Sequence, residues 1–166
     1  QVEYIKQQIA NGEIMQAVLS KEVTFEGQYN PFTLYRALRL INPSPYMYFM
    51  NLGDFNIIGA SPEILVQSKQ GKVTIRPIAG TRKRGINSSE DLLNKIDLIE
   101  DDKEKAEHMM LVDLARNDLS KVSTVGSVNV DEMMIVEKYS HVMHMTSNVI
   151  GQKKDESTAI DCMKAA

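Results

Sequence analysis

The chain has 166 residues, of which 43% are hydrophobic and 25% charged, a balance that excludes an intrinsically disordered segment and suits one globular domain. Its net charge of −3 and the lack of a long apolar run exclude a basic nucleic-acid-binding domain and a membrane-spanning segment. The single cysteine, Cys162, excludes an internal disulfide and is typical of a protein of the reducing cytoplasm.

The first 45 residues predict two helices with a strand between them. Apolar residues recur on one helical face over residues 2–10. Residues 14–25 are rich in β-forming side chains and predict a strand. Asn30 followed by Pro31 is typical of a helix start, so a second helix is expected from there to the breaker sequence NPSP at 42–45.

Short strands dominate the next part of the chain. We expect an antiparallel meander, because Gly53-Asp54 and the segment 69–71 are typical hairpin turns. The predicted strands cover residues 46–50, 55–61, 63–68 and 72–78. The stretch RPIAGTRKRG, residues 76–85, is interpreted as a loop that follows the last of them.

The second half predicts one long helix over residues 91–118, strands over 128–140 and 141–151, and the start of another helix. The predicted fold class is therefore α+β, a mainly antiparallel sheet with packed helices. Because helical patterns run to both ends, we expect the chain to be a segment of a longer polypeptide.

The predicted loop at 76–85 has the composition of an anion site. It carries four cations, Arg76, Arg82, Lys83 and Arg84. Gly80 would let the backbone approach a ligand closely, and Thr81 adds a hydroxyl donor, which suits a carboxylate. The alternative is an ordinary loop with a solvated basic rim.

An acidic residue lies within the apolar part of the predicted long helix. Glu107 falls on the same helical stripe as two leucines, so its charge needs compensation by a hard cation such as Mg²⁺ or by an ion pair with Lys103. Both alternatives stay open from the residues alone. Asp113 and Arg116, three residues apart, predict a buried structural pair.

Two histidines and a glutamate are candidates for proton transfer. His141 and His144 lie three apart in a predicted strand, which would place them on opposite faces and disfavour a shared metal. Either could act as a general acid or base, or be a hydrogen-bonded core residue. Glu63 follows Pro62 on a short turn and is either a rigid proton donor or an exposed turn residue.

Six stretches, in order along the chain, resemble the chorismate-utilising enzymes. They are GEIMQAVLS, INPSPYMYF, IIGASPEIL, RPIAGTRKRG, DKEKAEHMMLVDLARNDL and VEKYSHVMHMTSNVIG. The resemblance implies that residues 1–166 are the central portion of a single chorismate-binding domain with the family's larger α/β sandwich fold. It also implies that an N-terminal segment, a C-terminal part and a second metal-binding glutamate lie outside these residues.

Two positions distinguish branches of this family. In the family that this chain resembles, isochorismate synthases carry a lysine base at the position of Gln16. Aminodeoxychorismate synthases carry a nucleophilic lysine at the position of Ala79. The combination present here is similar to the anthranilate synthase pattern, which implies conversion of chorismate and ammonia into anthranilate and pyruvate in tryptophan biosynthesis. The alternatives are another chorismate-utilising enzyme and a non-catalytic tryptophan-binding fragment.

The resemblance assigns roles to single residues. Glu107 is the implied ligand of the cofactor Mg²⁺. Glu63 is the implied acid for the leaving C4 hydroxyl, and His144 matches the histidine associated with elimination of pyruvate. The implied contacts with chorismate are Gln16, Ala79, Gly80 and Thr81.

The resemblance also implies a partner and an inhibitor. A glutamine amidotransferase subunit, component II, would deliver ammonia. Tryptophan would act as a feedback inhibitor in a pocket lined by Asn42, Pro43, Pro45, Tyr46 and Met47. Neither nucleic acid nor a membrane is an expected partner.

Overall fold

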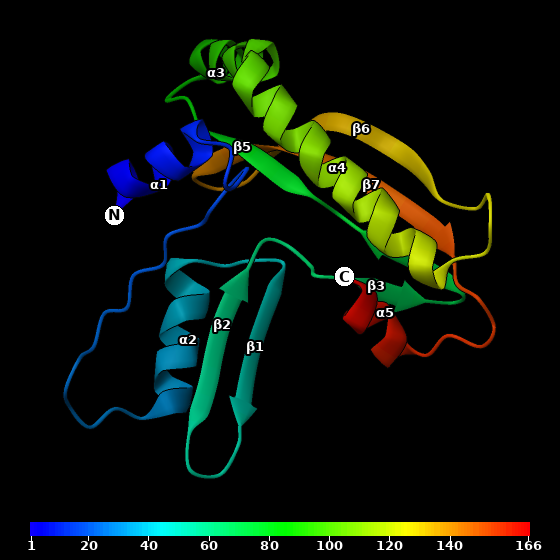
Figure 1. Cartoon of the computed structure of the whole chain (residues 1–166). Coiled ribbons are helices and arrows are strands. Elements are labelled where there is room, and N and C mark those ends of the chain that lie inside the picture. Colours follow the sequence, from blue (N-terminus) through cyan, green and yellow to red (C-terminus); the bar gives the residue numbers. More distant parts are fainter.

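The computed structural model describes all of residues 1–166 and confirms the α+β class (Figure 1). Its helices are α1 (Val2–Ala10), α2 (Pro31–Ile41), α3 (Ser88–Glu100), α4 (Asp102–Val122) and α5 (Ala159–Ala165). Its strands are β1 (Tyr46–Asn51), β2 (Asn56–Ser61), β3 (Gln67–Lys69), β4 (Lys72–Ile75), β5 (Ile78–Lys83), β6 (Asn129–Lys138) and β7 (Val142–Gln152). No helix has both the length and the apolar character that crossing a membrane requires.

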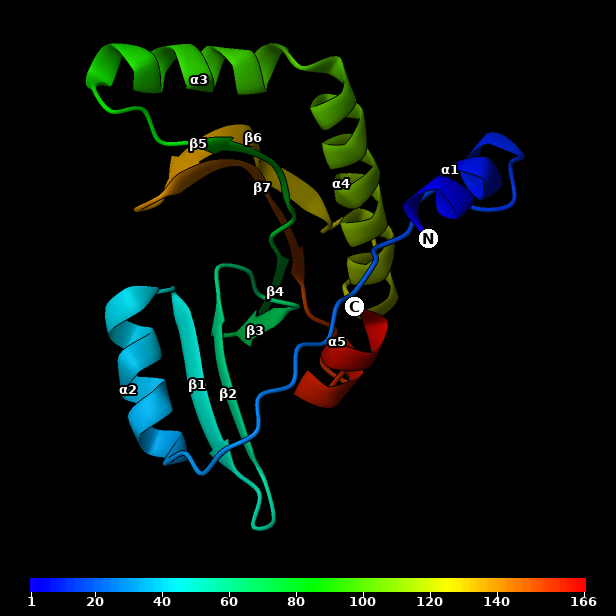
Figure 2. The ribbon, with the colours of Figure 1, turned by 90° about the vertical axis from the view of Figure 1, so that its left-hand side faces the viewer.

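The strands form two sheets and not the single meander that the sequence predicts. Strands β1 and β2 pair as a hairpin covered by α2, and they lie apart from the five-stranded sheet of β3 to β7 (Figures 1 and 2). The chain leaves β2 because the Ser61 hydroxyl accepts a hydrogen bond from the Glu63 N–H and donates one to the Glu63 carbonyl. This turn also shortens the strand predicted at 63–68, which begins only at Gln67.

Strand β7 is the centre of the larger sheet. Its first half pairs with β5 and its second half with β4 along one edge, while β6 pairs along the other edge, and all pairs are antiparallel. The interpretation of residues 76–85 as a loop is therefore wrong for residues 78–83. These residues form a strand because β7 offers them a complete hydrogen-bonding edge, interrupted only by a bulge at Gly80.

Helix α4 lies across this sheet and buries its core (Figure 1). The main cluster of buried apolar residues joins α4 to β4, β7 and α5, and it consists of Val73, Val112, Ala115, Leu119, Val122, Val149 and Cys162. A second cluster joins α3 to β7 through Leu98, Met143 and Met145. Alternate residues of β7 thus face the helices, as expected for a strand with one covered face.

The long helix predicted at 91–118 is two helices that meet at Asp101. The Asp101 backbone is extended, with φ −69° and ψ 107°, and its carboxylate accepts hydrogen bonds from the N–H groups of Lys103 and Glu104. A carboxylate in this position caps the first turn of α4 and interacts favourably with the helix dipole. The sharp corner in Figure 2 follows from this cap.

The strand predicted at 14–25 is absent, and these residues form an irregular, exposed connection between α1 and α2. Their β-forming side chains, such as Val18 and Phe25, remain exposed to solvent. A strand needs a neighbouring edge to satisfy its backbone, and within residues 1–166 no edge pairs with this segment.

A buried carboxylate joins α3 to the larger sheet. Asp91, whose side chain is only 6% exposed, receives hydrogen bonds from the Arg84 guanidinium, the Lys138 ammonium and the Gly85 N–H. Hydrogen bonds from Arg84, then Lys138 and then the Gly85 backbone hold the pKa of this carboxyl well below its ordinary value.

We expect Asp91→Asn to weaken the fold in a pH-dependent way. A carboxyl with a lowered folded-state pKa stabilises the fold above its unfolded pKa, about 3.9, and loses that contribution as the pH falls toward the lowered value. The melting temperature of the variant in the full-length protein should therefore lie below that of the unaltered protein at pH 7, with a gap that closes in acid. Thermal melts between about pH 7 and pH 2 test this, with the exposed Asp155→Asn as control. A gap independent of pH would contradict the charge-based explanation.

Candidate functional site

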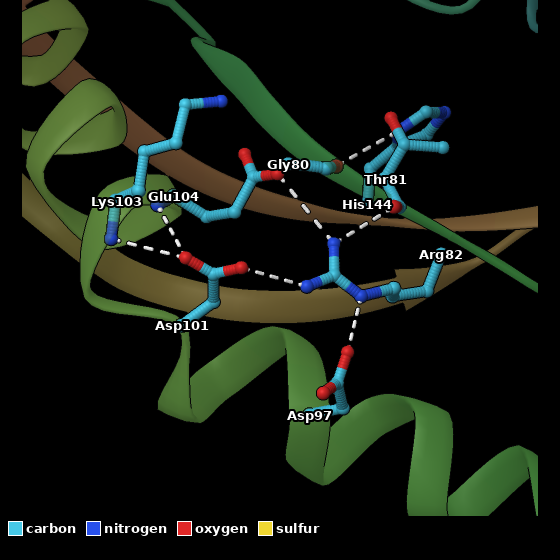
Figure 3. Close-up of polar contacts among 8 residues, drawn as sticks. All are labelled: Gly80, Thr81, Arg82, Asp97, Asp101, Lys103, Glu104 and His144. Atoms are coloured by element: carbon cyan, nitrogen blue, oxygen red, sulfur yellow. Dashed lines mark hydrogen bonds and ion pairs between the residues drawn. The ribbon is translucent and has the colours of Figure 1, made fainter.

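The bulge of β5 holds the first part of the candidate site. His144 on β7 lies opposite Thr81, with its Nδ1 3.1 Å from the Thr81 hydroxyl and 3.2 Å from the Gly80 carbonyl oxygen (Figure 3). A carbonyl only accepts hydrogen bonds, so the tautomer that carries its proton on Nδ1 satisfies this contact. In the neutral ring, Nε2 is then free to accept a proton.

Glu63 faces the same region from the turn after β2. Its carboxylate accepts a hydrogen bond of 3.2 Å from the Ile78 N–H at the start of β5. Desolvation by neighbouring atoms raises the pKa of the Glu63 carboxyl, and the Ile78 N–H and the charge of His144 offset part of that effect. The structure therefore brings the two residues predicted to transfer protons, Glu63 and His144, within electrostatic range of each other.

A second pair joins the exposed connection to α4. The Gln16 side-chain amide donates a hydrogen bond of 3.1 Å to the Glu107 carboxylate, across 91 positions of the sequence. Glu107 is half-buried and is bound by Gln16, and of the two alternatives left open by the sequence, the ion pair with Lys103 does not form. Residues one turn apart on a helix can pair, but these two side chains do not.

The structure also tests the other charge pair predicted on α4. Asp113 and Arg116 do pair at 3.2 Å, but their side chains are 64% and 57% exposed, so the predicted burial is wrong. They lie on the face of α4 away from the residues that pack on the sheet, such as Val112 and Ala115. The pair is therefore a surface interaction and contributes little stability.

Glu107 and Gln16 together present one carboxylate and one amide, which are oxygen donors of the kind that a hard cation takes. No group of three or more His, Cys, Asp or Glu side chains converges within residues 1–166. Mg²⁺ does not need such a cage, because it commonly keeps several waters and takes one or two carboxylates together with oxygens of the substrate. Glu107 supplies one carboxylate without a cationic partner, beside the neutral Gln16 amide.

Three of the four cations predicted to attract an anion are already paired. Arg76 contacts Glu137, Arg82 contacts carboxylates of α3 and α4, and Arg84 contacts Asp91. Lys83 alone of the four makes no ion pair. Arg76 thus ties the connection between β4 and β5 to β6, and the other two arginines tie β5 to α3 and α4.

The bulge itself depends on glycine. Gly80 has φ +66°, a conformation that L-residues with side chains adopt only at a cost. A Cβ at this position would lie 2.8 Å from Leu98 Cδ1 and 3.3 Å from Glu104 Oε2. The backbone of β5 therefore packs directly against the corner between α3 and α4.

We expect Gly80→Ala to destabilise the full-length protein by about 1 to 3 kcal/mol, from the left-handed backbone and the crowding of the fully buried Leu98. The melting temperature in a thermal melt measures this loss. Gly53→Ala is a suitable control, because Gly53 also has a positive φ but a Cβ added there would meet no atom within 4 Å. An equal loss in both variants would show that backbone conformation alone matters.

The remaining predicted substrate residue, Ala79, is buried and lies opposite Met145 on the helix-covered face of β7. Met145 belongs to the cluster that contains Leu98. A longer side chain at position 79 would enter this packed region, so the site accepts a small residue there.

The predicted inhibitor segment adjoins the proton-transfer residues. Asn42, Pro43 and Pro45 line a cavity of about 210 Å³ together with His141 and His144. The cavity joins the end of α2 to the start of β7. His141 lies just before β7, so the prediction that both histidines belong to one strand is wrong.

The last two residues of the predicted inhibitor segment lie in β1. Tyr46 pairs with Ser61 and Met47 with Ala60, on β2. The hairpin therefore places this segment beside the turn that carries Glu63.

Sequence reasoning misses one residue next to the site and gives another a different role. The Tyr139 ring packs edge-on to His144 at 5.5 Å, and its hydroxyl donates to Glu137. Desolvation, followed by the Glu137 hydrogen bond, raises the pKa of Tyr139 to about 12. The other is Arg82, which the sequence predicts to attract an anion but which lies at the centre of the polar network in Figure 3. Neither contact has a local sequence signal, because the partners lie on other elements.

The remaining histidine, His108, is a core residue. It is fully buried and its Nε2 lies 2.7 Å from the Ser147 hydroxyl on β7, while its Nδ1 has no partner. Burial lowers the pKa of the His108 imidazole. This position joins α4 to β7 and needs no ligand to explain its burial.

Comparison with known proteins gives one consistent result. The model of the family described as chorismate binding enzyme matches residues 1–166. The chain is 53% identical over 161 residues to anthranilate synthase component 1 of Pseudomonas aeruginosa, covering 97% of this chain and 33% of that protein. It is 51% identical to the protein of the same name from Neisseria meningitidis serogroup B, covering 99% of this chain and 33% of that protein.

A solved structure agrees with these relatives. The crystal structure of anthranilate synthase component I from Streptococcus pneumoniae is similar with a TM-score of 0.83 and 47% identity, covering 99% of this chain and 36% of that chain. The chain thus spans about a third of the length of the curated relatives that it matches.

Proposed function

Because the chain belongs to the family of chorismate-binding enzymes, we propose that it forms about a third of an anthranilate synthase component I, which converts chorismate and ammonia into anthranilate and pyruvate. The observation that carries the proposal is the identity of about half of all residues with relatives of that name over nearly the whole chain. The site agrees with it, because Gln16 and Ala79 leave no lysine at the two positions where the other branches use one.

The first half of the proposed reaction replaces a hydroxyl by an amine. Ammonia attacks C2 of chorismate and loses a proton, the two ring double bonds shift toward C4, and the C4 hydroxyl leaves as water after taking up a proton. Glu63 is the proposed donor of that proton, because its raised pKa favours the protonated acid and the Ile78 N–H fixes its orientation.

The second half aromatises the ring. A proton leaves C2, its electron pair completes the aromatic ring as the bond between C3 and the enolpyruvyl oxygen breaks, and the released enolpyruvate takes up a proton at its methylene carbon to give pyruvate. His144 is the proposed base, since its Nδ1 is directed at the Gly80 carbonyl and leaves Nε2 available. The bulge at Gly80 and Thr81 would orient the substrate through its backbone and hydroxyl groups.

Glu107 is the proposed ligand of Mg²⁺, with Gln16 fixing the carboxylate from the side. When bound, the ion would neutralise the carboxylate of chorismate and stabilise developing charge. Ammonia would come from a glutamine amidotransferase subunit, and tryptophan would bind at the segment of Asn42 to Met47 as a feedback inhibitor.

Anthranilate fluorescence tests the proposal. The full-length protein and the 166-residue chain are each incubated with chorismate, an ammonium salt and Mg²⁺. We expect anthranilate from the full-length protein and none from the chain alone, because the chain spans only a third of its relatives. Isochorismate or aminodeoxychorismate as the product, or tryptophan binding without any product, would overturn the assignment.

A further inference from the structure

The Arg82 side chain binds four groups from three elements (Figure 3). Its Nε donates to Asp97 in the last turn of α3 at 2.5 Å, and one terminal nitrogen donates to Asp101 at 2.8 Å. The other terminal nitrogen donates to the Thr81 carbonyl at 3.1 Å and to Glu104 at 3.5 Å. The Arg82 side chain is 23% exposed, and its contacts with Asp101 and Glu104 are partly buried, whereas Asp97 is 67% exposed.

Asp101 contributes to two structures at once. One carboxylate oxygen caps α4 by accepting from the N–H groups of Lys103 and Glu104, and the other accepts from Arg82. The first turn of α4 is thereby tied to β5 through a single carboxylate. Glu107 lies one helical turn beyond Glu104 on the same helix.

The strand side of this network is the bulge. Arg82 fixes the Thr81 carbonyl, and the backbone of Gly80 packs against Leu98 and Glu104. The corner between α3 and α4 and the bulge are therefore in direct contact.

We propose that Arg82 is a positioning residue, which fixes the separation between the substrate-binding bulge of β5 and the metal-binding Glu107 of α4. This inference rests on the proposed function. It assigns Arg82 no contact with chorismate or metal, and its effect passes through Asp101 and the Thr81 backbone. The planar guanidinium suits this role because it donates in fixed directions to several carboxylates, which a lysine ammonium cannot reproduce.

A positioning role makes a specific prediction about binding. If the bulge holds chorismate and Glu107 holds Mg²⁺, bound Mg²⁺ raises the affinity for chorismate. The ratio of the affinities with and without Mg²⁺, the coupling factor, depends on the distance between the bulge and Glu107. Such coupling factors are typically about 5 to 150. Arg82→Gln should lower this factor by about tenfold while leaving the affinity for chorismate without Mg²⁺ within about threefold of normal.

Titration calorimetry of the full-length protein with chorismate, with and without Mg²⁺, measures the coupling factor. Ammonia and glutamine are left out, so that no turnover occurs. Asp101→Asn is the second variant, because asparagine keeps the helix cap but removes the charge that Arg82 binds. Asp102→Asn is the matched control, since Asp102 lies next along α4, is 94% exposed and contacts only Lys105. Thermal melts establish that each variant is folded.

The outcomes separate this inference from the proposed function. Loss of coupling in Arg82→Gln and Asp101→Asn, but not in Asp102→Asn, supports the positioning role. A lower melting temperature with an unchanged factor shows that Arg82 only stabilises the fold and overturns it. If Arg82→Gln does not fold, the coupling factors of Arg82→Lys and Asp101→Asn, compared with that of Asp102→Asn, decide whether Arg82 is a positioning residue. The unaltered protein is assayed for anthranilate in parallel, and a failure there counts against the proposed function alone.

Discussion

Replacing Glu107 by glutamine in the full-length protein should lower the rate of anthranilate formation by on the order of 100-fold or more. The substitution replaces the carboxylate proposed to bind Mg²⁺ by a neutral amide, which is a much weaker ligand for a hard cation. The melting temperature should stay close to normal, because the amide oxygen can still accept the hydrogen bond from Gln16. Rate measured against Mg²⁺ concentration, together with a thermal melt, tests both parts.

Glu100→Gln is the matched control for this experiment, because Glu100 is exposed at the end of α3 and makes no ion pair. It should retain a normal rate. A near-normal rate for Glu107→Gln at ordinary Mg²⁺ would mean that Glu107 only receives the Gln16 hydrogen bond, and the metal-binding role would have to be abandoned.

Replacing Glu63 by glutamine should lower the rate by about 100-fold to 10,000-fold, the usual contribution of a positioned general acid. The amide keeps the hydrogen bond from the Ile78 N–H but has no acidic proton to give to the leaving hydroxyl. The fold should be little affected, because glutamine has the same shape and keeps this hydrogen bond to β5.

The pH dependence gives a second test of Glu63. The acid must be protonated to act, and desolvation raises its pKa, so the rate of the unaltered protein should fall as the pH rises through that raised value. In Glu63→Gln this fall should disappear from the pH–rate profile. Glu156→Gln, an exposed carboxylate without an ion pair, should keep it. An unchanged profile in Glu63→Gln would assign the ionisation to another group.

Local signals predict the elements that depend only on neighbours in sequence. Helix α2 begins at Pro31 as expected, because Asn30 caps it, and the hairpin of β1 and β2 turns at Gly53. The wrong predictions concern segments whose structure depends on a distant partner. Residues 14–25 have the composition of a strand but no edge to join, whereas residues 78–83 have turn-forming residues but an edge on β7.

The same distinction applies to the site. The proximity of Glu63 and His144 and the contact of Thr81 with His144 agree with roles assigned by resemblance, but no spacing in the sequence predicts them. The hydrogen bond from Gln16 to Glu107 spans 91 positions and is visible only in three dimensions. The number of positive charges in residues 76–85 also does not predict an anion site, because the local sequence does not show which carboxylates of other elements will pair with the arginines.

The central place of β7 has a consequence for how the chain folds. Three strands depend on β7 for pairing, and Lys72 finds its partner Gln152 only about 80 residues later. Such distant pairings close large loops and slow the search for the native state. On the ribosome, β4, β5 and β6 would all emerge before the strand that completes them. The unpaired edges and the apolar face of α4 would be exposed during that interval, which is the period when the nascent chain is most prone to aggregate.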